Sequence, residues 1–309
     1  MTPPTVETAV ETVETAVGPA VELPRAGRIP RRLRVWARRV ARVVESTPAT
    51  IGVAIVLAWV LVALLAPVLA PYPPNTTDPL ALASPTPSRA HWLGTDHHGR
   101  DILSRIVWGA RTVLTVAPLA VLGAAALGSL WGLSAGYYRG VVDLVLSRAS
   151  DIVLTFPVII LYTIVLATFG SSALNIILVL TVTKAPIIGR IVRGLTLDLR
   201  EREYVAAAKL RGESALYVML VEILPNARGP LLVDMCLRMG YTIVLIGALG
   251  FLGIGLPPPD PDWGGMVRDT YGMMSVWPHM ALYPCAAISS LVIGFNLLAV
   301  GLRELALRD

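Results

Sequence analysis

The sequence predicts an all-α membrane protein, on the evidence of its composition, its low charge and its apolar runs. The chain has 309 residues, of which 55% are hydrophobic and only 15% charged, and its mean hydropathy is +0.66. Soluble domains rarely combine so much apolar character with so little charge. The apolar residues also form runs of about 20 or more, the length that an α-helix needs to cross the hydrocarbon core of a bilayer.

The N-terminal part precedes the first apolar run. Residues 1–30 are rich in Thr, Val, Glu and Pro, which predicts a disordered tail. The tail has neither the basic start nor the apolar core of a signal peptide. Across 31–46, apolar residues recur at helical spacing among arginines, which predicts a basic amphipathic helix in the membrane interface. A basic flank without fixed structure is the alternative.

Six spans follow from the apolar runs and their breaks. The run 152–183 is uncharged and too long for one helix, and Gly170 with the two serines after it divides the run. An extracytoplasmic loop is expected over 71–111 and a cytoplasmic loop over 200–226. The predicted spans are 51–70, 112–138, 152–169, 173–191, 231–256 and 279–302, within a membrane domain of residues 47–309.

Charge sets the orientation of these spans. With this threading, the segments on one side hold 21 of the 26 Lys and Arg residues. Cytoplasmic segments carry the excess of Lys and Arg in membrane proteins. We therefore expect both termini and the 200–226 loop in the cytoplasm.

The most informative segment is EYVAAAKLRGESALYVMLVEILPN, residues 203–226. Gly212 is suited to end a first short helix in a left-handed conformation, and Ser214 to cap a second. Pro225 is expected to stop that second helix. An ordered, charged loop between spans indicates a surface for another protein, and an ordinary connecting loop is the alternative.

This segment resembles the coupling loop of ABC-importer permeases, whose pattern is EAA, three residues, Gly, nine residues, then I-x-L-P. Five residues fall on that frame: Ala207, Ala208, Gly212, Leu224 and Pro225. The chain departs from it at Ala206 and Glu222. Four more residues match the dipeptide/oligopeptide branch: Glu203, Tyr204, Ser214 and Asn226.

Other segments are similar to the same branch and cover about residues 45–305. They include LGTDHHGRD from Leu93, the Trp263-Gly264 pair, and FNLL from Phe295. The chain departs from the branch at Ala299-Val300 and at Lys184, where an uncharged residue is usual. The chain is therefore identified as resembling the second, C-type permease of such systems.

The resemblance implies a type I ABC importer permease fold in a bacterial plasma membrane. It implies half of a pathway for di- or oligopeptides or a related small substrate, and coupling to ATPases through 203–226. The implied partners are a second homologous permease, two cytoplasmic ABC ATPases, an extracytoplasmic substrate-binding protein and the lipid bilayer, without nucleic acid. The sequence has no GxxxxGK[ST] phosphate loop, so no enzyme activity or cofactor is expected here, and ATP with Mg²⁺ is expected on the ATPases.

Two polar residues lie inside predicted spans. Lys184 either lines the pathway or extends to the cytoplasmic headgroups, and Asn296 is expected to hydrogen-bond to a neighbouring helix. Asp234 and Arg238 are spaced to form a local ion pair. His91, His97 and His98 lack the spacing of a metal site, so no metal is expected. An ion-gradient-driven transporter and a membrane scaffold are the alternatives to the importer.

Overall fold

The computed structural model describes residues 46–257 and 260–306. The predicted tail and nearly all of the predicted interfacial helix lie outside these residues. The described residues belong to one compact unit. Its regular elements are helical, and the described segments contain only two isolated β-bridges, Thr77 with Arg100 and Thr95 with Asp101.

The helices follow one another along the chain with short connections, except for one long loop before α5. In chain order they are α3 (Thr47–Leu64), α4 (Ala66–Leu69), η1 (Ala81–Ala83), α5 (Ile102–Tyr138), α6 (Gly140–Thr155), α7 (Val158–Phe169), α8 (Ala173–Leu199), α9 (Glu203–Leu210), α10 (Ala215–Tyr217), the π-helical η2 (Val218–Ile223), α11 (Leu224–Phe251), α12 (Trp263–Thr270), η3 (Tyr271–Met273) and α13 (His279–Ala306).

Five of these helical segments are long and apolar enough to cross a membrane, and a sixth crossing results if α6 and α7 count together. The predicted single span 152–169 is wrong as a continuous helix, because α6 and α7 are bent by 85° at their junction. Pro157 lacks a backbone N–H, and the preceding Phe156 takes the extended conformation (φ −74°, ψ 135°) that a following proline favours.

Several helix ends also differ from the predicted span limits. Helix α5 begins at Ile102, not 112, because the Asp101 side chain accepts a hydrogen bond from the Ser104 backbone N–H at 2.7 Å. The outer loop therefore ends near residue 101. Helix α8 continues to Leu199, eight residues past the predicted end of its span. Its polar inner turns stay helical and bind α6: Arg190 pairs with Asp151 at 2.7 Å and Arg193 with Asp143 at 2.5 Å.

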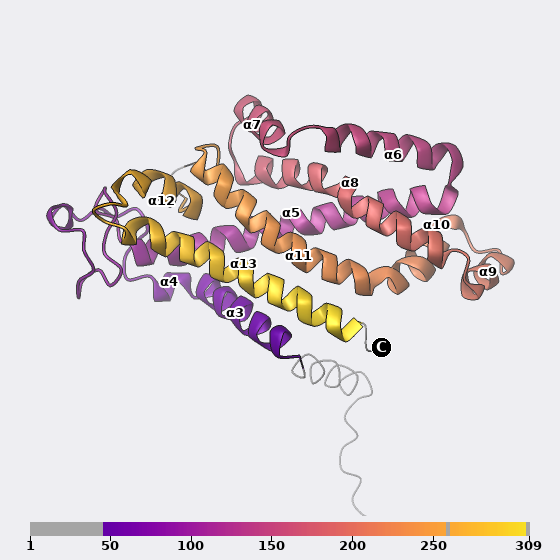
Figure 1. Cartoon of the computed structure of the whole chain (residues 1–309), viewed down its shortest axis with the longest axis horizontal. Helices are drawn as coiled ribbons and strands as arrows, with labels where there is room; N and C mark the ends of the chain where they lie inside the picture. Colours follow the sequence, from indigo (N-terminus) through magenta and orange to yellow (C-terminus); the bar gives the residue numbers. More distant parts are fainter. Residues whose placement is uncertain (1–45, 258–259, 307–309) are drawn as a thin grey trace, which may run out of the picture. The chain divides into compact units, whose positions relative to one another are not determined.

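Helices α5 and α8 pack closely along a row of glycines. A Cβ at Gly128 would lie 2.6 Å from the Ala185 carbonyl oxygen, and one at Gly136 would lie 2.7 Å from Thr196 Cβ. A Cβ at Gly132 would overlap the Gly189 carbonyl oxygen. Small residues at such positions let helix backbones approach closely. The two helices thus form the central pair of the bundle (Figure 1).

Different elements lie at the two ends of the long helices. Figure 1 shows α9 and α10 at one end of the long helices, and α12 with the loop before α5 at the other. The start of α3 and the end of α13 meet at the α9 end, where Ser46 Oγ donates to Glu304 Oε2 at 2.9 Å.

Candidate functional site

The elbow, residues 203–226, has the turn that the sequence predicts. Gly212 adopts φ +79°, and its N–H donates to the Lys209 carbonyl at 3.0 Å. The Glu213 N–H donates to the Ala208 carbonyl at 3.3 Å. These paired bonds satisfy the last carbonyls of α9 and define a Schellman turn, which favours glycine at the left-handed position.

The second half of the elbow starts as predicted and then differs. Ser214 Oγ accepts from the Tyr217 N–H at 3.2 Å and caps α10. Pro225 does not end the helix, because η2 runs directly into α11. In this π-helical turn the Leu224 N–H donates to Met219, and Pro225 follows within the first turn of α11, where a missing N–H is tolerated.

An apolar core holds the elbow against the inner halves of α5 and α8. Val205, Ala208, Val218 and Ile223 are fully buried in this core. The elbow residues identified by resemblance therefore divide into two groups. Ala208 is buried, and Tyr204 and Leu224 are half-buried. The exposed ones are Glu203, Ala207, Gly212, Ser214, Pro225 and Asn226.

Polar contacts that the sequence did not indicate tie the elbow, and Arg200 just before it, to the end of α5. Arg200 Nη1 donates to the Tyr137 carbonyl at 2.6 Å and to the Gly136 carbonyl at 3.3 Å. The Lys209 ammonium lies 5.3 Å from the centre of the Tyr137 ring. Within the elbow, Arg211 pairs with Glu222 at 3.2 Å. These contacts join residues distant in sequence, so no local motif reveals them.

The free surface of the elbow includes large apolar side chains. Leu210 is 90% exposed, Leu216 59% and Val221 49%. Tyr204 presents a buried hydroxyl without a hydrogen-bond partner among the described residues, and burial raises the pKa of this phenol. Exposed apolar side chains gathered at one place mark an interaction surface.

The opposite end, residues 71–101 and 260–278, is called the outer cap after its predicted side of the membrane, and it is held together differently. His91 Nδ1 lies 2.9 Å from Asp101 Oδ1, and its Nε2 lies 3.3 Å from Asp78 Oδ2. Trp263 is 1% exposed and donates from Nε1 to the Ile106 carbonyl at 3.0 Å. The histidine serves the internal structure of the cap. No group of three or more potential metal ligands occurs within the described ranges.

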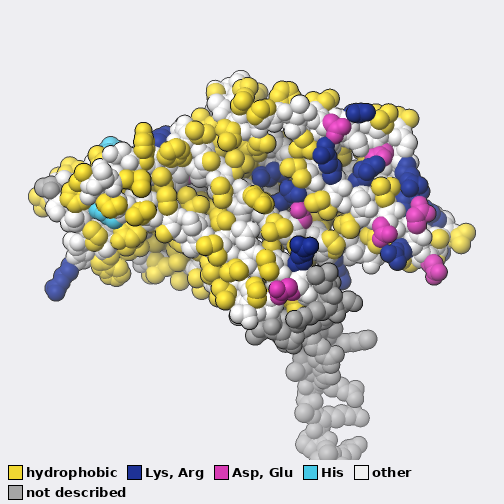
Figure 2. Space-filling model, in the orientation of Figure 1, with side chains coloured by type: hydrophobic (Ala, Val, Ile, Leu, Met, Phe, Trp, Pro, Cys, Tyr) yellow, Lys and Arg dark blue, Asp and Glu magenta, His cyan; other side chains and the backbone are white. Residues whose placement is uncertain are grey.

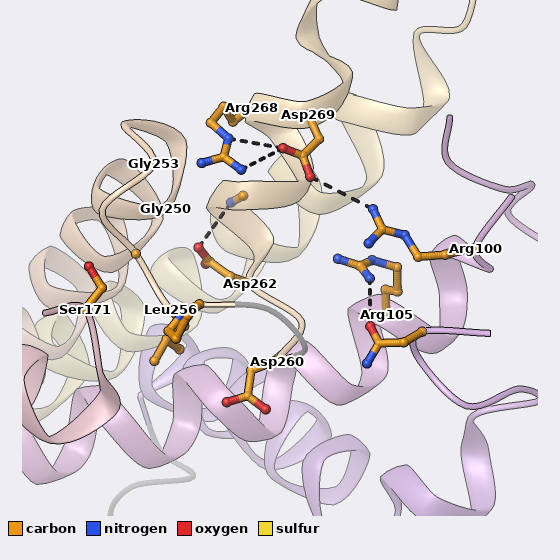
Figure 3. Close-up of a pocket in the computed structure, with 14 residues that line it drawn as sticks. Arg100, Arg105, Ser171, Gly250, Gly253, Leu256, Asp260, Asp262, Arg268 and Asp269 are labelled. Carbon is orange, nitrogen blue, oxygen red and sulfur yellow. Dashed lines mark hydrogen bonds and ion pairs between the residues drawn. The ribbon is translucent and has the colours of Figure 1, made fainter. Parts of the chain in front are cut away.

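A cavity of about 230 Å³ lies in the outer cap, lined by residues of opposite charge (Figure 3). Arg105 is 6% exposed and donates to the Pro74 carbonyl and Asn75 Oδ1 at 3.2 and 3.3 Å. Asp262 accepts from the backbone N–H groups of Gly264 and Gly265 at 3.1 and 3.2 Å. Burial raises the pKa of the Asp262 carboxyl to about 6.

A third polar group lies within the helix bundle on two helices that pack together, α8 and α11; its members Lys184, Asp234 and Arg238 are called the charged cluster. Lys184 of α8 is 9% exposed, so it is packed among helices. The predicted pair on α11 is confirmed, with two hydrogen bonds of 2.5 and 3.0 Å from Arg238 to Asp234. Asn296 lies against Gly240 of α11. Its side chain does not form the predicted hydrogen bond to a neighbouring helix within the described residues.

Comparison with known proteins defines the class. Residues 128–308 match the family described as "Binding-protein-dependent transport system inner membrane component". Residues 35–85 match the "N-terminal TM domain of oligopeptide transport permease C". The chain therefore belongs to the binding-protein-dependent transport system inner membrane component family.

Relatives of known name agree with this assignment. The dipeptide transport permease DppC of Alkalihalophilus pseudofirmus is 38% identical over 87% of this chain and 88% of its own. DppC of Haemophilus influenzae is 37% identical over 84% and 90%. The glutathione transport permease GsiD of Pectobacterium atrosepticum is 36% identical over 81% and 83%.

The chain is thus a multi-pass membrane permease subunit of an ABC importer with the type I fold. It is a transporter component, and ATP hydrolysis belongs to partner subunits. An importer of this family works with a second permease, ATPases and a binding protein. This assignment replaces the gradient-driven transporter and the scaffold.

Proposed function

We propose that the chain forms half of the translocation pathway for di- or oligopeptides, or a related small peptide such as glutathione, in a bacterial inner membrane. The names of its relatives support this substrate class. The partners in this proposal are a homologous permease, two cytoplasmic ABC ATPases and an extracytoplasmic binding protein. ATP and Mg²⁺ bind to the ATPases, and this chain holds no cofactor or metal.

The elbow is the ATPase docking element in this proposal, and both termini lie in the cytoplasm with it. The carrying observation is the combination of a buried anchor with exposed Leu210 and Leu216 at the same end of the bundle. An anchored apolar surface suits a partner that must transmit force, since interface affinity concentrates in a few well-packed contacts.

The contacts of the elbow provide a route from motion of the ATPases to the membrane helices. Closure of the ATPases displaces the elbow, and Arg200 and Lys209 carry the displacement to the end of α5. Because α5 and α8 are in close backbone contact, they move as one unit. Rigid-body rotation of this kind alternates access between the two sides.

Introducing a charge at an exposed apolar position of the elbow tests the docking role. Leu210→Asp places a charge on the 90% exposed elbow position, and Leu82→Asp is the matched control at a 49% exposed position in the outer loop. We expect Leu210→Asp to lose the ATPases on affinity purification while keeping the second permease, and Leu82→Asp to keep both. Retention of the ATPases by Leu210→Asp contradicts the docking role. Failure of the wild-type complex to import labelled dipeptides contradicts the substrate class.

A further inference from the structure

The charged cluster lies deep in the bundle. Lys184 is 11 residues from the outer start of α8, which is about 17 Å along the helix. Arg238 is 13 residues from the outer end of α11, about 20 Å along its helix. Both distances exceed half of the roughly 30 Å hydrocarbon thickness, so these cations lie near the middle of the spans or just beyond it.

The cluster contains more positive than negative charge. Asp234 is engaged by Arg238 through both oxygens. Lys184 forms no ion pair or hydrogen bond with any residue in 46–257 or 260–306. An ionised group at membrane depth requires a partner or a water-filled surrounding, because a bare charge in a low dielectric is costly.

The α11 pair of the cluster reaches the surface of this subunit, whereas Lys184 is buried beneath it. Figure 2 shows basic and acidic side chains in the middle of the face over α8 and α11, surrounded by apolar side chains. Arg238 and Asp234 have side-chain exposures of 13% and 16%. Intramembrane charges face a protein interior or an aqueous cavity, not lipid. A face of this kind suits the pathway between two permease subunits.

We propose that Lys184, assisted by Arg238, binds a carboxylate of the transported substrate at the middle of the pathway. The inference rests on the proposed function, since every dipeptide with a free C-terminus, and glutathione, carries a carboxylate at neutral pH. Lys184 supplies the unpaired charge. Asp234 is a positioning residue that holds the Arg238 guanidinium by two parallel bonds.

A lysine suits a site through which a substrate passes. A lysine ammonium is a compact charge on a flexible stem with three rotatable donors, whereas an arginine presents a rigid planar fork. A single ammonium can follow a moving carboxylate through several positions and release it. The structure thus assigns Arg238 as the fixed element and Lys184 as the mobile element of the site.

The test uses the full complex in proteoliposomes with its binding protein, and four forms of this chain. Lys184→Met removes the charge at similar length, Lys184→Arg keeps the charge, and Arg303→Met removes an exposed cation at the inner end of α13. Uptake of labelled Ala-Ala and of its C-terminal amide is measured below saturation. The preference of the binding protein cancels, because each variant is compared with wild type on the same substrate.

We expect Lys184→Met to lower Ala-Ala uptake about tenfold and to change amide uptake less than about twofold, as for directly interacting charged groups in a double-mutant cycle. Lys184→Arg should restore most Ala-Ala uptake, and Arg303→Met should resemble wild type. Equal loss for both substrates, or no loss for either, overturns the site. Loss of the second permease on purification of Lys184→Met also overturns it, because the carboxylate is then that of the partner subunit. Absence of wild-type uptake instead overturns the proposed function.

Discussion

The outer cap and the elbow occupy opposite ends of the long helices and are stabilised in contrasting ways. In the cap, charged groups pair with one another: Asp96 lies 2.7 Å from Arg100, and Asp262 is buried at the start of α12. The elbow instead buries one side and exposes Leu210 and Leu216 on the other. The cap is held by ion pairs between its own residues, whereas the elbow is held by its buried apolar side and offers exposed leucines to a partner.

The largest expected effect follows from adding a side chain where the backbones of the cap and α11 approach closely. A Cβ at Gly264 would overlap the carbonyl oxygen of Gly247 on α11. Gly264→Val should therefore displace α12 and cost more than about 3 kcal/mol through overpacking and lost contacts. Thermal unfolding in detergent measures this. The matched control is Gly272→Ala, where a Cβ meets nothing within 4 Å. Equal stability of the two variants would contradict the close packing of the cap.

A bulky side chain at the turn of the elbow should weaken binding of the ATPases, because its Cβ meets no nearby atom of this chain. A Cβ at Gly212 meets nothing within 4 Å, but φ is +79°. Gly212→Trp should weaken docking of the ATPases by about 2 kcal/mol or more, by analogy with interface hot spots. Gly212→Ala carries the same backbone strain, about 1 kcal/mol, without the bulk. Binding of purified ATPase to the two variants separates the effects, and equal affinities would refute an interface at this turn.

The link between elbow and α5 should show an intermediate effect. Arg200→Met removes the donor to two carbonyls at the end of α5. We expect the attachment of the elbow to α5 to lose about 1–2 kcal/mol of stabilisation. Basal ATPase activity should remain while substrate-stimulated uptake falls. Arg202→Met is the control, because Arg202 pairs with the exposed Asp198. Unchanged coupling in Arg200→Met would exclude this route of transmission.

The smallest effect concerns pH in the cap. Burial raises the pKa of Asp262 above its usual 3.8 to about 6, with Arg268 opposing and Asp269 adding to this shift. A carboxyl raised in the folded state contributes stability at low pH that is lost as pH rises through about 6. Between pH 5 and 7.5 the loss is about 1 kcal/mol. Hydrogen exchange of α12, corrected for intrinsic rates, should show more protection at pH 5, and Asp262→Asn should abolish the difference.

The sequence predicted local features of the elbow well, because they depend on neighbouring residues. Gly212 and Ser214 have the conformations that their types favour. Pro225 was misinterpreted, since the stop rule assumes an α-helix and the preceding turn is π-helical. The break in the third predicted span arises from Pro157. The apolar run around Pro157 is long enough to predict one continuous helix, so the run alone does not reveal the break.

Contacts between residues that are distant in the sequence cannot be predicted from local patterns. The Arg200 bonds to α5 and the Asp96 and Arg105 contacts in the cap depend on packing across the chain. The sequence marks Lys184 as an ionisable residue in a span, but only the structure shows that it is buried and has no ion-pair partner among the described residues. Apolar length and charge bias therefore predict topology, whereas the placement of paired charges requires the folded bundle.

The most direct test is photo-cross-linking in native membranes from two exposed positions. Leu210 is 90% exposed on the elbow, and Trp92 is 69% exposed in the cap. A photoreactive residue at Leu210 should capture an ABC ATPase, and one at Trp92 should capture the extracytoplasmic binding protein. Capture of the binding protein from Leu210, or of an ATPase from Trp92, would contradict the assignment of the elbow as the cytoplasmic coupling element.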